Sequence, residues 1–64
     1  MTPQEIRDIR VALGRSQNEF AKIIGATELS VHRWEAGKTS PLPAFAEKLT
    51  KLQEWVTRQR EGKE

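Results

Sequence analysis

The chain has 64 residues, enough for one small domain and too few for two. It contains no cysteine, a single histidine and no apolar run near the roughly 20 residues of a membrane span, which excludes disulfides, cysteine-rich or histidine-rich metal sites and membrane insertion. The 11 basic and nine acidic residues leave a net charge of +2, too small to identify a nucleic-acid-binding protein by itself.

Two capping signals open the first two predicted helices. "TPQE" begins a helix at Thr2, and "SQNE" begins a second helix at Ser16. In each stretch a hydroxyl residue is followed three positions later by glutamate, which is the pattern of a capping box. Gly14 and Gly25 end these helices, because glycine readily adopts the left-handed conformation that follows a helix.

Two further helices follow. The third is capped by Thr27 and ends near Gly37, and the loop "GKTSPLP" separates it from a fourth. The fourth helix begins around Leu42 or Pro43, since proline suits a first helical turn. A break near Leu52 would give five helices, although no glycine or proline lies there to force one.

Each predicted helix carries one apolar stripe at helical spacing, and no segment alternates like a strand. The sequence therefore predicts an all-α fold, a compact four- to five-helix bundle. The residues expected in its core are Ile6, Ile9, Leu13, Phe20, Ala21, Ile24, Val31, Trp34, Phe45, Leu49 and Leu52.

The third helix has two different faces. Residues advance about 100° around a helix, so Val31 and Trp34 point to one side. The opposite side carries Glu28, Leu29, His32 and Arg33. Most such faces are simply solvated, but a leucine has no reason to lie on a purely wet surface. Two short helices joined by a glycine turn, the second with an apolar residue facing out, are typical of a helix-turn-helix.

The stretch "SQNEFAKIIGATELSVHRWEAGKTSP" resembles the helix-turn-helix of the lambda Cro/repressor (XRE-like) family. Ala21 lies where that family has a small residue for close helix contact, and Gly25 lies at the turn. The resemblance places Phe20, Ile24, Val31 and Trp34 in buried positions. It covers about residues 5 to 56 and implies a DNA-binding domain whose second motif helix enters the major groove.

The resemblance also implies which residues contact DNA. Thr27, Glu28, Leu29 and Arg33 would face base edges, Gln17 would hold a phosphate, Ser30 and His32 would flank the groove, and Lys38 and Thr39 would touch the backbone. The chemistry suits these roles: Arg33 can bind guanine with two hydrogen bonds, Glu28 can accept from cytosine N4, and Leu29 can meet a thymine methyl. Glu28 could instead repel wrong sites.

Four further residues have a structural and a functional interpretation: Arg10, Glu35, Trp55 and His32. Arg10 and Glu35 are expected to form a structural ion pair, as in the family, rather than to be two solvated charges. Trp55 either covers the edge of the core or belongs to a dimer contact. His32 is not expected to bind metal or to act as a base, because no partner lies nearby to orient it.

The function expected from the sequence is sequence-specific DNA binding by a small cytoplasmic transcriptional regulator or repressor. The alternative is a protein-binding adaptor or antitoxin-like module that uses the same fold with weak or lost DNA binding. We expect no enzyme activity, cofactor or metal. The expected partners are double-stranded DNA, a second copy held weakly and chiefly on DNA, and a toxin or other protein. The DNA-binding domain is expected to span residues 1–57, followed by a frayed polar tail over 58–64.

Overall fold

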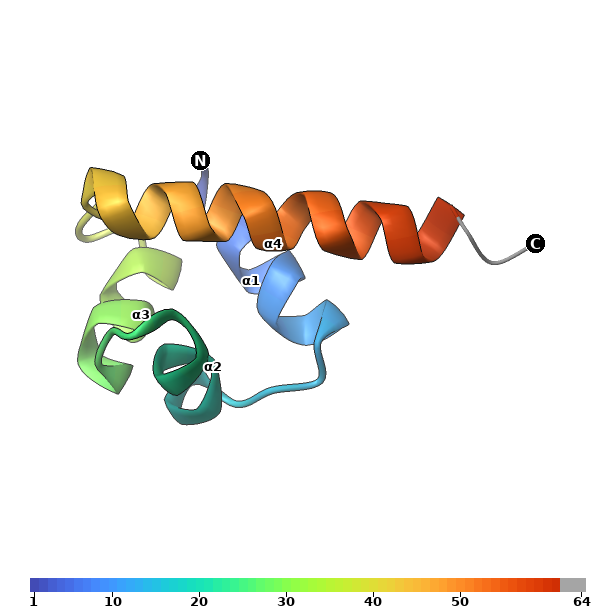
Figure 1. Ribbon diagram of the computed structural model, residues 1–64. Coiled ribbons are helices and arrows are strands. Elements are labelled where there is room, and N and C mark those ends of the chain that lie inside the picture. The colour runs from blue at the N-terminus through green and yellow to red at the C-terminus, as the bar shows by residue number, and fades with distance from the viewer. Residues whose placement is uncertain (62–64) are drawn as a thin grey trace.

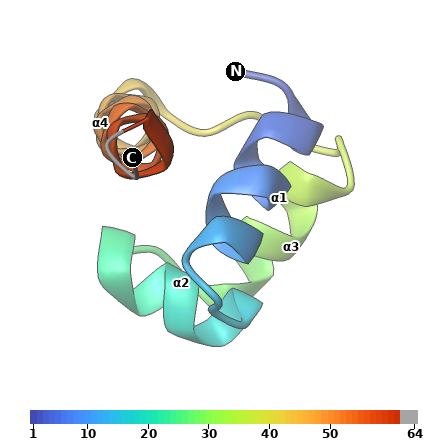
Figure 2. The same ribbon diagram turned by 90° about the vertical axis from the view of Figure 1, so that its right-hand side faces the viewer.

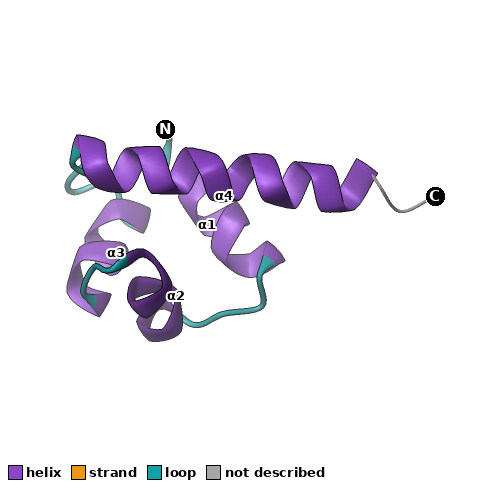
Figure 3. Cartoon of the chain, viewed as in Figure 1, coloured by secondary structure: helices purple, strands orange, loops and turns teal. Residues whose placement is uncertain are grey.

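The computed structural model describes residues 1–61 as a bundle of four α-helices joined by loops, with no strand in that range (Figure 3). The helices are α1 (Pro3–Ala12), α2 (Gln17–Ile24), α3 (Glu28–Glu35) and α4 (Pro43–Glu61). The all-helical fold predicted from the sequence is confirmed, with four helices rather than five. Across residues 1–61, no helix is both long and apolar enough to cross a membrane.

The long helix α4 forms one side of the molecule and the three shorter helices form the other (Figure 1). Seen along α4, α1 lies next to α3 and α2 lies across their lower end (Figure 2). Helix α1 packs on both α3 and α4, and α2 packs most extensively on α3. The C-terminal end of α4 extends past the shorter helices, so its last turn is largely exposed.

Side-chain caps begin the first three helices, as the sequence predicts. Thr2 Oγ1 accepts from the Glu5 amide at 3.1 Å, and Glu5 Oε1 accepts from the Thr2 amide at 2.7 Å. Ser16 and Glu19 form the same reciprocal pair before α2. Each box provides partners for two amides that have none within their own helix, which fixes where these short helices start.

The core lies where the four helices meet, and the predicted set of core residues is confirmed. Eight apolar side chains are buried: Ile6, Ile9, Phe20, Ala21, Ile24, Val31, Trp34 and Leu49. Leu13, Phe45 and Leu52 pack against them while staying partly exposed, and so does Ala26, which the periodicity did not single out. The rings of Trp34 and Phe45 lie 5.5 Å apart and join α3 to α4.

Helix α4 differs from the expectation at its far end. It continues without a break past Leu52 to Glu61. The first four residues of the expected polar tail are therefore helical, because no proline or glycine interrupts 44–61 and Glu54 and Arg58 lie one turn apart on its wet side. The rest of that tail, 62–64, lies outside the described residues. Trp55 is 48% exposed, so it covers the core only in part.

The attachment of α4 depends on Leu49, the single residue of this helix with no exposed surface. We expect Leu49→Ala to lower the free energy of unfolding by about 3 kcal/mol, because it removes buried methyl groups and leaves a cavity under α4. Leu42→Ala is the matched control, because Leu42 is 65% exposed and its truncation is expected to cost under about 0.5 kcal/mol. Urea unfolding followed by helical circular dichroism measures both, and equal losses would contradict this account of the core.

Candidate nucleic-acid interface

Helices α2 and α3 form a helix-turn-helix whose geometry depends on two small residues. Gly25 has φ +80°, a left-handed conformation that is strained for residues with a side chain. The Ala26 amide donates to the Ala21 carbonyl at 2.8 Å and closes the turn. Ala21 is buried, so its small side chain lets α2 and α3 approach closely. The turn thus holds α3 at a fixed angle to α2.

The structure separates the two faces of α3 as the sequence predicts. Val31 and Trp34 are buried against the core. The outward face is made of Glu28, Leu29, His32 and Arg33, all exposed. Leu29 is 55% exposed, and it is a large apolar side chain on a face otherwise made of charged and polar groups. Such a residue has no role in the core and is available for contact with another molecule.

An open recess of about 300 Å³ lies between the start of α2 and the outward face of α3. It is lined by Gln17, Glu28, Leu29 and His32. All four belong to the set that the resemblance assigned to DNA, and the fold brings them together from two helices. The recess therefore combines carboxylate, amide, imidazole and aliphatic groups on one surface.

The first turn of α3 is held by hydrogen bonds within the chain. Thr27 Oγ1 accepts from the Ser30 amide at 3.1 Å and donates to Ser30 Oγ at 3.0 Å. Asn18 Nδ2 donates to Glu28 Oε1 at 3.3 Å, which links the starts of α2 and α3. The Thr27 hydroxyl is therefore engaged as a cap, and Asn18, which sequence reasoning missed, orients the Glu28 carboxylate.

The carboxylate of Glu35 lies at the centre of a polar cluster at the other end of α3, with its side chain only 1% exposed. Arg10 Nε donates to Oε2 at 2.7 Å and Arg10 Nη2 donates to Oε1 at 3.0 Å. Gln17 Nε2 donates to Oε1 at 3.2 Å, and Arg7 Nε lies 3.6 Å from the same oxygen. The expected pair of Arg10 and Glu35 is therefore present, with two further partners that the sequence did not indicate.

The electrostatics of this cluster favour the charged form of both main partners. Burial by itself raises the pKa of Glu35, but hydrogen bonds from Arg10 and Gln17 and the charges of Arg10 and Arg7 outweigh it and leave this pKa lowered. The hydrogen bond to Glu35 raises the pKa of Arg10. Arg10 Nη1 also donates to the Arg15 carbonyl at 3.0 Å, so one guanidinium holds both α3 and the loop before α2.

The remaining residues that the resemblance assigned to phosphate contacts lie in two places: Gln17 at the start of α2, and Lys38 and Thr39 in the loop after α3. The Gln17 side chain donates to Glu35 and is partly buried, so a phosphate at this position would meet mainly the amides of Gln17 and Asn18, because the Glu19 amide already donates to Ser16. Lys38 and Thr39 are exposed in the loop after α3 and do not line the recess.

Within residues 1–61, no group of three or more histidine, cysteine or acidic residues is placed to hold a metal ion.

A family model described as helix-turn-helix matches residues 6–52, more than half of the chain and the whole of α2, the turn and α3. The chain belongs to the Cro/repressor-like helix-turn-helix family. Neither the comparison with curated proteins nor the comparison with solved structures finds a match. The family supports a DNA-binding role for this domain, and it is not typically enzymatic.

The lowered pKa of Glu35 gives this helix-turn-helix a pH-dependent stability. A carboxyl group whose pKa is lower in the folded state stabilises it above the unfolded pKa of about 4.3, and this contribution is lost as the pH falls through the folded pKa. We expect Glu35→Gln to lower the free energy of unfolding by about 3 kcal/mol at neutral pH, since it leaves Arg10 without a charged partner. This difference from the unmodified protein should shrink in acid, because Glu35 itself becomes neutral there.

Urea unfolding at several pH values measures this difference, with Glu47→Gln as the control at an exposed carboxyl. Hydrogen bonds from backbone amides also lower the pKa of Glu5 and of Glu19, so the unmodified protein loses stability in acid at several groups. Only the difference between the protein and its Glu35→Gln variant isolates Glu35. A difference that stays constant between neutral and acidic pH would contradict the assignment of a buried, charged carboxylate.

Proposed function

We propose that this domain binds double-stranded DNA with the outward face of α3 in the major groove and represses transcription from a short operator. The observation that carries the proposal is the exposed set of Leu29, Arg33 and Glu28 on a helix whose opposite face is locked into the core. The proposed docking follows the family, in which the N-terminal part of the second motif helix contacts base edges.

Three side chains are proposed to read bases, each by its own chemistry. Arg33 can donate two hydrogen bonds to guanine O6 and N7. Leu29 offers an aliphatic surface to the methyl group of thymine. The hydrogen bond from Asn18 occupies one oxygen of Glu28, which leaves the other oxygen to accept from cytosine N4. A site containing guanine, thymine and cytosine at neighbouring positions is therefore favoured.

Other groups are proposed to hold the phosphates. The amides in the first turn of α2 point out of a helix N-terminus, where the helix dipole favours an anion. Thr27, which the resemblance assigned to a base edge, is proposed instead to lie at the groove edge beside Ser30, because their hydroxyls already bond each other. His32 lies in the recess, and Lys38 and Thr39 lie in the loop that follows α3. These contacts set the register of the protein on DNA without reading sequence.

Selection of bound sequences from a random DNA pool tests the proposed operator, and a reporter placed behind the selected site tests repression. The selection, together with a salt titration on mixed-sequence DNA, also distinguishes a DNA-binding domain from the adaptor alternative. A DNA-binding domain loses affinity for mixed-sequence DNA steeply as salt rises, because bound cations are released from the duplex. An adaptor would select no sequence and bind mixed DNA poorly at every salt concentration.

We expect two copies to bind a near-palindromic site, with half-sites roughly 34 Å apart, one turn of DNA. The free protein is expected to be a monomer or a weak dimer, because the large apolar side chains that it exposes are too few for an obligate interface. Sedimentation of the protein with a full site and with a half-site measures this stoichiometry. A tight dimer without DNA, at nanomolar concentration, would overturn the expectation.

We expect substitutions at Arg33 and Lys38 to separate base reading from phosphate binding. Arg33→Ala should cost roughly 1–3 kcal/mol at the selected site and relax preference at one base pair. Lys38→Ala should weaken binding to all sequences about equally and lower the salt slope by about one. Both variants should fold normally, because both side chains are exposed. Titrations with the selected site and its single-base variants, at several salt concentrations, measure these effects.

Two outcomes would count against the proposed docking. If Arg33→Ala keeps full discrimination while Lys38→Ala loses it, α3 lies in the groove in a different register. If neither substitution changes binding, α3 is not the reading helix. Lys22→Ala serves as the matched control for a lost surface cation, because Lys22 is exposed on α2 and lines neither the recess nor the loop after α3.

A further inference from the structure

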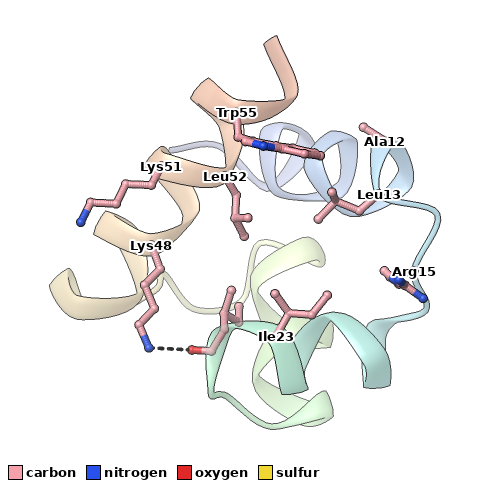
Figure 4. A pocket seen from close by; sticks show the side chains of 9 residues that line it. Ala12, Leu13, Arg15, Ile23, Lys48, Lys51, Leu52 and Trp55 are labelled. Atoms are coloured by element: carbon pink, nitrogen blue, oxygen red, sulfur yellow. Dashed lines mark hydrogen bonds between the residues drawn. The ribbon is translucent and has the colours of Figure 1, made fainter. Parts of the chain in front are cut away.

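A second surface, away from the outward face of α3, has the features of a peptide-binding groove. It is an open hollow of about 730 Å³ between α4, the end of α1 and the end of α2 (Figure 4). Trp55 and Leu52 from α4 face Leu13 and Ile23 across it. Trp55 is 48% exposed and Ile23 49%, so the groove leaves large apolar side chains in water.

The charged residues that line this groove are all cations. Lys48 and Lys51 lie on one side of the apolar strip and Arg15 lies on the other (Figure 4). Lys48 Nζ donates to the carbonyl of Ile24, the last residue of α2, at 3.3 Å, and it has no carboxylate partner within residues 1–61. No aspartate or glutamate lines the groove. An apolar floor between cationic edges is complementary to an apolar ligand with acidic edges.

The groove and the recess on α3 are separate. They share no lining residue, and no residue of α3 lines the groove. Helix α2 contributes to both, with Gln17 at its start in the recess and Ile23 at its end in the groove. Since these residues are six positions apart, they are separated by roughly 9 Å along the helix. A ligand in the groove therefore leaves the DNA-facing side of α3 open.

A second copy of this chain suits the groove poorly when it pairs symmetrically. A two-fold contact would place Arg15, Lys48 and Lys51 of one copy against the same three cations of the other. Such like-charge contacts oppose association, and nothing acidic in the groove offsets them. The charges instead favour a partner that supplies carboxylates.

We propose that this groove binds a short acidic amphipathic helix of another protein. The groove follows α4 from Lys48 to Trp55, about two helical turns, so it fits apolar anchors at positions i, i+3, i+4 and i+7 of the ligand. Trp55 and Ile23 contact these anchors, while Arg15 and Lys51 contact carboxylates on the two edges of the ligand helix. This binding does not depend on the proposed DNA contacts, so either function can fail alone.

A synthetic peptide of about 14 residues, long enough to form some helix, tests the proposal. It carries leucine and phenylalanine at the four anchor positions and glutamates on both flanks, and its matched control has lysine for every glutamate. Fluorescence anisotropy of the labelled peptides measures binding to the full chain. We expect the acidic peptide to bind roughly tenfold more tightly than the lysine peptide, with a preference that falls as salt rises.

Variants of the protein locate the binding. Trp55→Ala should weaken binding of the acidic peptide roughly tenfold, as expected for a central aromatic contact. Ile23→Ser provides a second variant at a half-exposed position, and circular dichroism checks that both fold. The double variant Arg15→Glu/Lys51→Glu should also lose roughly tenfold. The control double variant Lys22→Glu/Lys38→Glu changes the net charge equally outside the groove and should bind within about twofold of the unmodified protein.

Three results would overturn the proposal. The first is that the acidic and lysine peptides bind equally or that neither binds. The second is that Trp55→Ala and Ile23→Ser bind the acidic peptide as tightly as the unmodified protein does. The third is that sedimentation finds a dimer of the free protein that Trp55→Ala dissociates, which would assign the groove to a second copy.

Discussion

The buried carboxylate of Glu35 is the constraint on which the arrangement of the first three helices depends. A charge with a side chain only 1% exposed must be paired and hydrogen-bonded, or burying it would cost several kcal/mol. Its partners come from α1, as Arg7 and Arg10, and from α2, as Gln17. Arg10 adds a bond to the loop between them through the Arg15 carbonyl. One carboxylate and its partners thus hold three helices and a loop together.

The direction of these bonds matters more than their strength. Burial of Val31 and Trp34 favours an inward face for α3, but apolar contacts are non-directional and tolerate some rotation of a helix about its axis. The two bonds from Arg10 tolerate less, because the guanidinium and the carboxylate must meet in a fixed geometry. The rotation that satisfies Glu35 is the rotation that turns Leu29 and Arg33 outward. A helix of eight residues would not hold this orientation alone in water.

Local features of the fold could be predicted from the sequence because their causes are local. The capping boxes at Thr2 and Ser16 and the turn at Gly25 depend on residues within a few positions of each other. Apolar periodicity likewise indicated the core residues. Bonds between helices could not be predicted in this way. Gln17 donates a hydrogen bond to Glu35, 18 positions away, and Asn18 donates one to Glu28, 10 positions away. Apolar periodicity does not indicate such pairs.

The candidate sites differ in the same respect. The outward residues of α3 follow from the helical repeat, and the family resemblance assigned their roles. The groove beside Trp55 did not follow, because its lining comes from segments far apart in the sequence: four residues from α4, two from α2 and three from the end of α1 and the loop after it. Ile23 illustrates the difficulty: it lies beside the buried Ile24 in sequence, and only the packing of α4 across α2 shows that it lines a surface hollow.

The distribution of charge gives the modest net charge of +2 a physical meaning. The recess on α3 includes the carboxylate of Glu28. At a DNA sequence where no base donates a hydrogen bond to its free oxygen, this negative charge opposes binding, because it repels the phosphates. In the proposed docking, attraction to phosphate on that side depends on Arg33, Lys38 and the helix amides, which are too few to bind DNA tightly without base contacts. Repulsion by the one carboxylate and attraction by a few donors together favour discrimination between DNA sequences over affinity for DNA of any sequence. The cations of the groove do not line the recess, so in the proposed arrangement they can attract an acidic partner while α3 binds DNA.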